Sequence, residues 1–198
     1  MFIELTDHLR CIADHAESFL VLVPDEMEGR RVLRGTMGCP VCQAEYRIHA
    51  GIAEFGPVTP HGAAAPPGAP DATAIHAFLG IEGPGGYVGL LGGAARLGEE
   101  LAALLPGVHL VAVNPPEAIS PSVRLSVLRA QRLPLKGRAF RGMVVGMPQA
   151  LDIEWQRSAI QAVLPGLRVT GTGPVPDESG FELLGEAAGW WVGRRSTG

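Results

Sequence analysis

The sequence predicts an α/β protein in which a small N-terminal domain precedes a shortened, mostly parallel sheet that closes with an antiparallel hairpin. One observation is an apolar run at 86–91 that leads through Gly92 and Gly93 into leucines at helical spacing. A second apolar run at 108–114 completes the strand, crossover helix, strand pattern of a Rossmann-like unit. In addition, every cysteine lies within the first 42 residues. If the protein binds a small molecule, the glycine turn is the expected place.

The other expected elements follow in the order of such a sheet. They are a short helix at 72–79, a third strand at 123–128, an amphipathic helix at 152–164, a fifth strand at 166–170 and a terminal hairpin at 181–194. Only eight residues, 115–122, separate the second and third strands. Because a parallel crossover usually needs about a dozen residues or more, the helix between these strands is expected to be missing.

The composition is that of a globular protein. Of the 198 residues, 46% are hydrophobic, which is enough for a substantial core. No apolar run reaches the roughly 18 residues of a membrane span, and Glu4 and Asp7 occur where a signal peptide would be apolar. We therefore expect a cytoplasmic protein that does not associate with membranes. Residues 1–56 carry five Arg against nine acidic residues, and the net charge of the chain is −4, so there is no general nucleic-acid signature.

The three cysteines, Cys11, Cys39 and Cys42, are an odd number, which argues against a disulfide framework. The two-residue spacing of Cys39 and Cys42 lets both thiolates reach one tetrahedral ion, and Cys11 with His15 offers a second pair. Three sulfurs and one imidazole would form a closed structural zinc site. His15 is preferred as the fourth ligand because it shares a tight turn with Cys11. Three other side chains could take that position: His8, His49 and Asp14.

The segments between these ligands read as short strands. Strands are expected at 19–23, 31–34 and 46–48, with a polar turn at 24–29. A ribbon of such short hairpins has too little core to fold alone, so metal binding should supply much of its folding free energy.

Three regions are therefore expected along the chain. They are a zinc ribbon at 1–56, a linker rich in proline, alanine and glycine at 57–71, and a Rossmann-like domain at 72–198. The linker is expected to separate the cores of the two domains.

Residues 39–52 read Cys-Pro-Val-Cys-Gln-Ala-Glu-Tyr-Arg-Ile-His-Ala-Gly-Ile. This run resembles the end of the small zinc-ribbon proteins that activate tRNA and protein methyltransferases, whose pattern is roughly C-P-x-C-G-x-E-Y-P-I-x-D-G-I. The chain departs from that pattern at Gln43, Arg47 and Ala50. The resemblance covers about residues 1–56 and implies a structural zinc site. A protein partner is also expected.

Residues 123–145 resemble the third and fourth strands of class I S-adenosylmethionine-dependent methyltransferases. In that family the third strand ends in D-A-x-x-L-P and leads through S-F-D to the fourth strand. The resemblance covers roughly residues 75–195, and the order of elements along the chain carries it more than any single motif. It implies a methyltransferase-like sheet with S-adenosylmethionine held near Gly92, Gly93 and Asn114.

The positions that should hold this cofactor depart from the family pattern. Of the turn D-x-G-x-G-x-G, only the middle glycine, Gly93, remains. Asn114 replaces the acid that accepts the ribose hydroxyls, and Arg129 replaces the acid that faces the adenine. No catalytic signature follows the fourth strand. The main expectation is a degenerate, non-catalytic domain that acts as a binding or scaffold subunit and lacks micromolar affinity for S-adenosylmethionine.

Two alternatives remain open at this level. One is an active methyltransferase with relaxed motifs, possibly acting on RNA. The other is a pocket for a different ligand, such as a nucleotide with its phosphates on Arg129 and Arg132. RNA could bind through the basic stretch 124–141, which also contains Arg129 and Arg132, and no acidic residue occurs in 123–150. Its basic residues could form an anion or partner patch, which we assign to Arg129, Arg132, Lys136, Arg138 and Arg141.

Overall fold

The computed structural model of the chain describes residues 1–58 and 68–197. The N-terminal part contains η1 (Ile3–His8), β1 (Val21–Glu28), β2 (Arg31–Gly38), β3 (Glu45–His49) and β4 (Ile52–Phe55). The middle contains α1 (Ala72–Leu79), β5 (Tyr87–Leu91), η2 (Gly92–Leu97), α2 (Gly98–Leu104), β6 (His109–Val113), β7 (Leu125–Ala130) and β8 (Phe140–Val145). The C-terminal part contains η3 (Gln149–Leu151), α3 (Ile153–Ala162), β9 (Val163–Thr172), β10 (Phe181–Ala187) and β11 (Trp190–Arg195).

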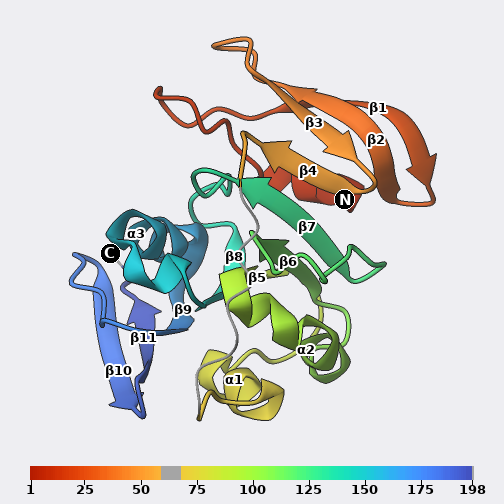
Figure 1. Cartoon of the computed structure of the whole chain (residues 1–198). Coiled ribbons are helices and arrows are strands. Elements are labelled where there is room, and N and C mark those ends of the chain that lie inside the picture. The colour runs from red at the N-terminus through yellow and green to blue at the C-terminus, as the bar shows by residue number, and fades with distance from the viewer. Residues whose placement is uncertain (59–67, 198) are drawn as a thin grey trace.

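The eleven strands of the described residues belong to one sheet with the order β1-β2-β3-β4-β7-β6-β5-β8-β9-β11-β10. The N-terminal strands lie at one end, and β10 and β11 lie at the other (Figure 1). The α/β class is confirmed. The sheet as a whole is not mostly parallel, because five of its ten neighbouring pairs are antiparallel and the five parallel pairs lie in the middle.

The N-terminal strands join the rest of the sheet through β4, which pairs in parallel with β7 from Ile52–Val127 to Phe55–Ala130. The same hydrophobic cluster contains Leu5 and Leu9 from the N-terminal part and Trp191 from the last strand. The expectation of two separate cores is therefore wrong, since residues 1–56 complete a shared core. The domain boundaries themselves stay a prediction, and residues 59–67 of the expected linker lie outside the described residues.

The parallel strands are buried on both faces, as expected for strands covered by helices. Side chains of β5 alternate between two clusters: Val88 and Leu90 pack with residues of α1 and α2, and Leu91 packs with residues of α3. In Figure 1, α1 and α2 lie together, apart from α3. The glycine turn at the end of β5 therefore begins between two packed layers.

Local differences from the expected elements have simple causes. The segment 24–29 continues β1 as far as Glu28, with register shifts that accommodate Pro24 at the sheet edge. Helix α3 ends directly at the start of β9, so the fifth strand begins earlier than expected. Residues 114–124 contain no helix, as the short connection predicts. Within the described ranges, no helix has the length and apolar character needed to cross a membrane.

Candidate metal centre and cofactor crevice

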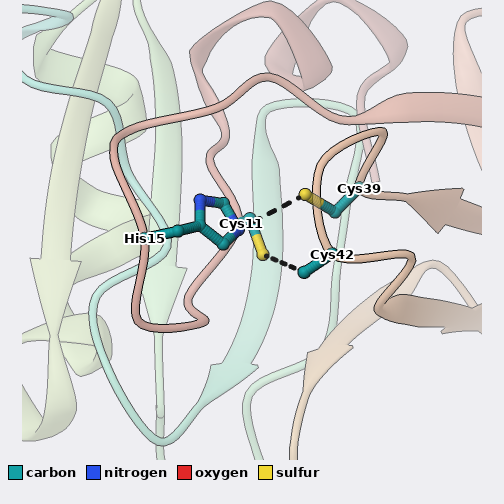
Figure 2. A group of neighbouring side chains, drawn as sticks. All are labelled: Cys11, His15, Cys39 and Cys42. Carbon is teal, nitrogen blue, oxygen red and sulfur yellow. Dashed lines mark hydrogen bonds between the residues drawn. The ribbon is translucent and has the colours of Figure 1, made fainter.

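The four predicted metal ligands come together beside the N-terminal strands. One ligand atom from each of Cys11, His15, Cys39 and Cys42 lies within 4.8 Å of the others. The Cys11 and Cys42 sulfurs are 3.6 Å apart, and the Cys39 sulfur is 3.5 Å from His15 Nε2 (Figure 2). Zinc–ligand bond lengths in a tetrahedral site place two sulfurs about 3.8 Å apart and a sulfur and a nitrogen about 3.5 Å apart. The four side chains could hold a metal ion.

Local contacts prepare these side chains for metal binding. The Nδ1 of His15 lies 2.7 Å from the Ala16 carbonyl oxygen. When Nδ1–H donates this bond, Nε2 keeps its lone pair and faces Cys39, which is the arrangement typical of a metal-binding histidine. The Tyr46 hydroxyl accepts a hydrogen bond from the Ile12 N–H and lies 3.0 Å from the Cys11 sulfur. Tyr46 is a supporting residue that was not predicted, although it belongs to the Glu-Tyr part of the zinc-ribbon pattern.

The thiols do not share one electrostatic environment. Burial opposes ionisation of Cys39, but the backbone N–H groups of Cys42 and Val41 outweigh it and lower the Cys39 pKa to about 6. Burial and the neighbouring Cys11 raise the pKa of Tyr46 to about 12, so this hydroxyl keeps its proton. The backbone bond to Ala16 raises the pKa of His15. The lowered pKa of Cys39 favours its thiolate, which is the form that binds a metal cation.

The predicted cofactor crevice lies at the glycine turn, and another part of the chain fills it. Gly92 has a φ of +56°, and a Cβ added there would collide with the Gln149 side chain and the Met147 carbonyl. The Gly93 N–H donates to the Met147 carbonyl at 2.8 Å. A Cβ on Gly146 would lie 2.5 Å from the Ala94 nitrogen. These glycines permit close packing of the segment 146–149 on the turn, so the turn has little backbone left for a ligand.

The Asn114 side chain joins the carboxyl ends of two neighbouring strands by hydrogen bonds. Its Nδ2 donates to the Ala130 carbonyl at 2.7 Å, and its Oδ1 accepts from the Ala130 N–H at 2.8 Å. Both polar groups of the buried side chain therefore clamp the end of β6 to the end of β7. The space remaining next to Gly93 is a cavity of about 60 Å³. Ligand pockets are typically about 300–1,000 Å³.

The five residues assigned to a basic patch do not form one surface. Arg129 lies near the carboxyl end of β7, whereas the Arg141 guanidinium, at the amino end of the parallel strand β8, donates to the carbonyls of residues 82–85. Lys136 donates to the Asp7 carbonyl, and Arg138 lies in the same connection. The connection between β7 and β8 therefore distributes these residues over both ends of the parallel strands, and their role as an anion or partner patch stays a prediction. Arg129 lines a cavity of about 390 Å³. Arg132 lines a different cavity of about 530 Å³ together with Arg10 and Trp155, which the sequence did not single out.

Comparison with known proteins gives structural neighbours only. No known family model matches the chain, and no curated protein sequence is significantly similar to it. Among solved structures, a chain from the complex between the Haloferax volcanii Trm112 methyltransferase activator and a methyltransferase is 17% identical, with 51% of each chain covered and a TM-score of 0.42. The chain thus spans about half the length of that neighbour.

Two further neighbours are also described as methyltransferases. The Haemonchus contortus phosphoethanolamine N-methyltransferase 2, solved with S-adenosyl-L-methionine, is 17% identical over 54% of this chain and 30% of its own, with a TM-score of 0.41. An Agrobacterium tumefaciens protein described as a predicted O-methyltransferase is 18% identical over 63% of this chain and 79% of its own, with a TM-score of 0.43.

Proposed function

We propose that this protein is a zinc-stabilised, methyltransferase-like binding subunit that does not use S-adenosylmethionine. The observation that carries the proposal is the contact between the segment 146–149 and the glycine turn. S-adenosylmethionine would need the backbone at Gly92 and Gly93, where Met147 and Gln149 already pack. The buried Gln149 would have to leave the turn before a ligand could approach, and the cavity of about 60 Å³ is far too small for a nucleoside cofactor.

The ion is proposed to be zinc because three sulfurs and one imidazole form a ligand set that zinc prefers, at distances that suit its tetrahedral geometry. Four protein ligands leave no open position for a substrate or a water molecule. The bound ion would therefore stabilise the fold by connecting the segment 11–15 to the turn 39–42, and it would not take part in catalysis.

Calorimetric titration of the zinc-loaded protein with S-adenosylmethionine and S-adenosylhomocysteine tests the cofactor part of the proposal. We expect no saturable heat of binding for either compound at concentrations high enough to reveal a Kd of about 100 μM. A Kd near or below about 10 μM for either compound would overturn the proposal and favour an active methyltransferase. Metal analysis after purification without chelator is expected to give one zinc per chain, and finding no zinc would contradict the assignment.

Binding of a protein partner is proposed at the outer edge of β1. This strand pairs only with β2 among the described residues, so its other side is an open edge. Val21 and Val23 on this strand are 50% and 60% exposed, and Phe19, which precedes the strand, is 56% exposed. An open edge with exposed apolar residues favours addition of a partner strand.

The edge can be tested by capture of a partner with the full chain. The double variant Val21→Lys/Val23→Lys should lose the partner, because charges on an edge strand oppose further pairing. The matched control, Leu183→Lys/Leu184→Lys on the opposite edge strand β10, should retain it. Equal capture by wild type and the β1 variant would contradict the assignment of this edge.

A further inference from the structure

A second cavity of about 530 Å³ lies between the N-terminal segment and α3, away from the glycine turn. Its walls come from three parts of the chain: Arg10 before the metal centre, Gln131 and Arg132 after β7, and Trp155 and Ser158 on α3. Its volume lies within the range of small-molecule sites. The cavity exists because the N-terminal segment folds onto the connection that follows β7.

Arg10 is held in this wall by its backbone. Leu9 bridges to Leu135, and the Arg10 N–H donates to the Pro134 carbonyl at 2.9 Å. Its guanidinium is poorly satisfied: Nη2 has a long contact of 3.4 Å with the Leu133 carbonyl, and Nε is buried without a partner among the described residues. A buried guanidinium N–H that lacks an acceptor favours a ligand that supplies one.

Arg132 adds a second guanidinium to the same cavity. Its side chain is exposed and forms no hydrogen bond or ion pair with any residue in the described part of the chain. Arg10 and Arg132 thus both line this cavity. Guanidinium groups match phosphate oxygens in geometry, so two of them in one wall favour an anion that contacts both.

Two acidic residues also line the cavity, but both are already engaged. Asp152 Oδ1 accepts hydrogen bonds from the Glu154 and Trp155 N–H groups and caps α3. Glu154 Oε1 accepts from Arg157 Nη1 at 2.6 Å. In the described part of the chain, neither carboxylate forms an ion pair with Arg10 or Arg132. The charge of Glu154 is balanced by Arg157, whereas Asp152 keeps its negative charge at the start of α3.

We infer that this cavity binds a small ligand that combines a phosphate group with a planar ring. Arg10 and Arg132 would hold the phosphate, and the Trp155 indole offers an aromatic surface for the ring. The Ser158 hydroxyl can donate or accept hydrogen bonds at the ring edge, and the Gln131 amide oxygen can accept one while its Nε2 donates to the Pro57 carbonyl. Nucleoside 5′-monophosphates have this chemistry. No residue of the glycine turn lines this cavity, so binding here can be measured whether or not S-adenosylmethionine binds.

The test titrates the zinc-loaded full chain with phenyl phosphate and with each of the four common nucleoside 5′-monophosphates. Binding is measured by tryptophan fluorescence and by calorimetry. We expect saturable binding of phenyl phosphate or at least one nucleotide with a Kd below about 1 mM. Inorganic phosphate should compete more weakly, and phenol should not bind. The variant Trp155→Phe should lose the fluorescence response while calorimetric binding persists, because Trp190 and Trp191 are buried elsewhere.

Charge-removing variants decide whether the site is the one described. Arg10→Gln and Arg132→Gln should each weaken binding by about 10-fold or more, which is the usual effect of losing a charged hydrogen bond. Arg34→Gln removes the same charge from an exposed position on β2 and should leave the affinity unchanged. Because Arg132 is exposed and unpartnered, its variant is expected to fold normally. No saturable binding of any of the five probes, or unchanged affinity in Arg132→Gln, would overturn the inference.

Discussion

Replacement of Asn114 by alanine tests whether this residue is a structural clamp or a free cofactor ligand. In the folded protein its amide forms two buried hydrogen bonds with the Ala130 backbone, at 2.7 and 2.8 Å. Asn114→Ala leaves the Ala130 N–H and carbonyl without partners, at about 1–3 kcal/mol each. The residue also has a φ of +51°, which costs an alanine about 1 kcal/mol more than an asparagine. We therefore expect a loss of at least about 3 kcal/mol in the free energy of unfolding.

The measurement is denaturant unfolding followed by tryptophan fluorescence, with the midpoint and slope fitted together. Asn114→Gly is the matched control because it removes the same two bonds but tolerates the positive φ. It should cost about 1 kcal/mol less than the alanine variant. A loss below about 1 kcal/mol in Asn114→Ala would refute the clamp and leave the side chain available to a ligand.

Three other perturbations test the packing and the electrostatics. Cys39→Ser should lower the midpoint of a single unfolding transition, because the N-terminal part shares its core with the sheet; a surviving second transition would contradict this. Gly92→Ala should lower the free energy of unfolding by about 2 kcal/mol or more, because the added Cβ meets the packed segment 146–149. The control Gly38→Ala has open space around the added Cβ and should change stability little. Equal effects of the two variants would be inconsistent with the packing. Burial lowers the pKa of His109 to about 4, so the unfolded chain takes up a proton first as the pH falls below about 6.5. The free energy of unfolding should therefore fall between pH 7 and pH 4, and the fall should be up to about 3 kcal/mol larger in the wild type than in the variant His109→Gln. Denaturant titration at each pH measures both proteins. Identical pH profiles would contradict this prediction.

The cluster of candidate metal ligands could be predicted because metal-binding chemistry restricts the sequence. Two thiolates that bind one ion from a tight turn need a short spacing, as in Cys39 and Cys42, and the matching pair in Cys11 and His15 is equally local. The choice of His15 over His8 agrees with the structure, which places His8 against Tyr87 instead. The buried strands and the missing crossover helix were also readable, because both follow from apolar runs and chain length.

Long-range pairing could not be predicted in the same way. Nothing local in 52–55 shows that this strand will pair with 125–130, and that single parallel pairing merges two expected domains into one sheet. The role of the glycines at the turn could not be predicted for a related reason. Glycine indicates that something approaches the backbone closely, but the sequence does not say whether it is a ligand or, as at Gly92, another segment of the chain.

Amide chemical shifts of the isotopically labelled, zinc-loaded protein during titration with S-adenosylmethionine test the central claim most directly. If the segment 146–149 remains packed on the glycine turn, signals of residues 91–94 and 146–149 should stay unchanged up to a large excess of the compound. Saturable shifts confined to these two segments, with an affinity in the micromolar range, would show that the segment moves aside and admits the cofactor. That result would contradict a closed crevice and a subunit that acts by binding alone.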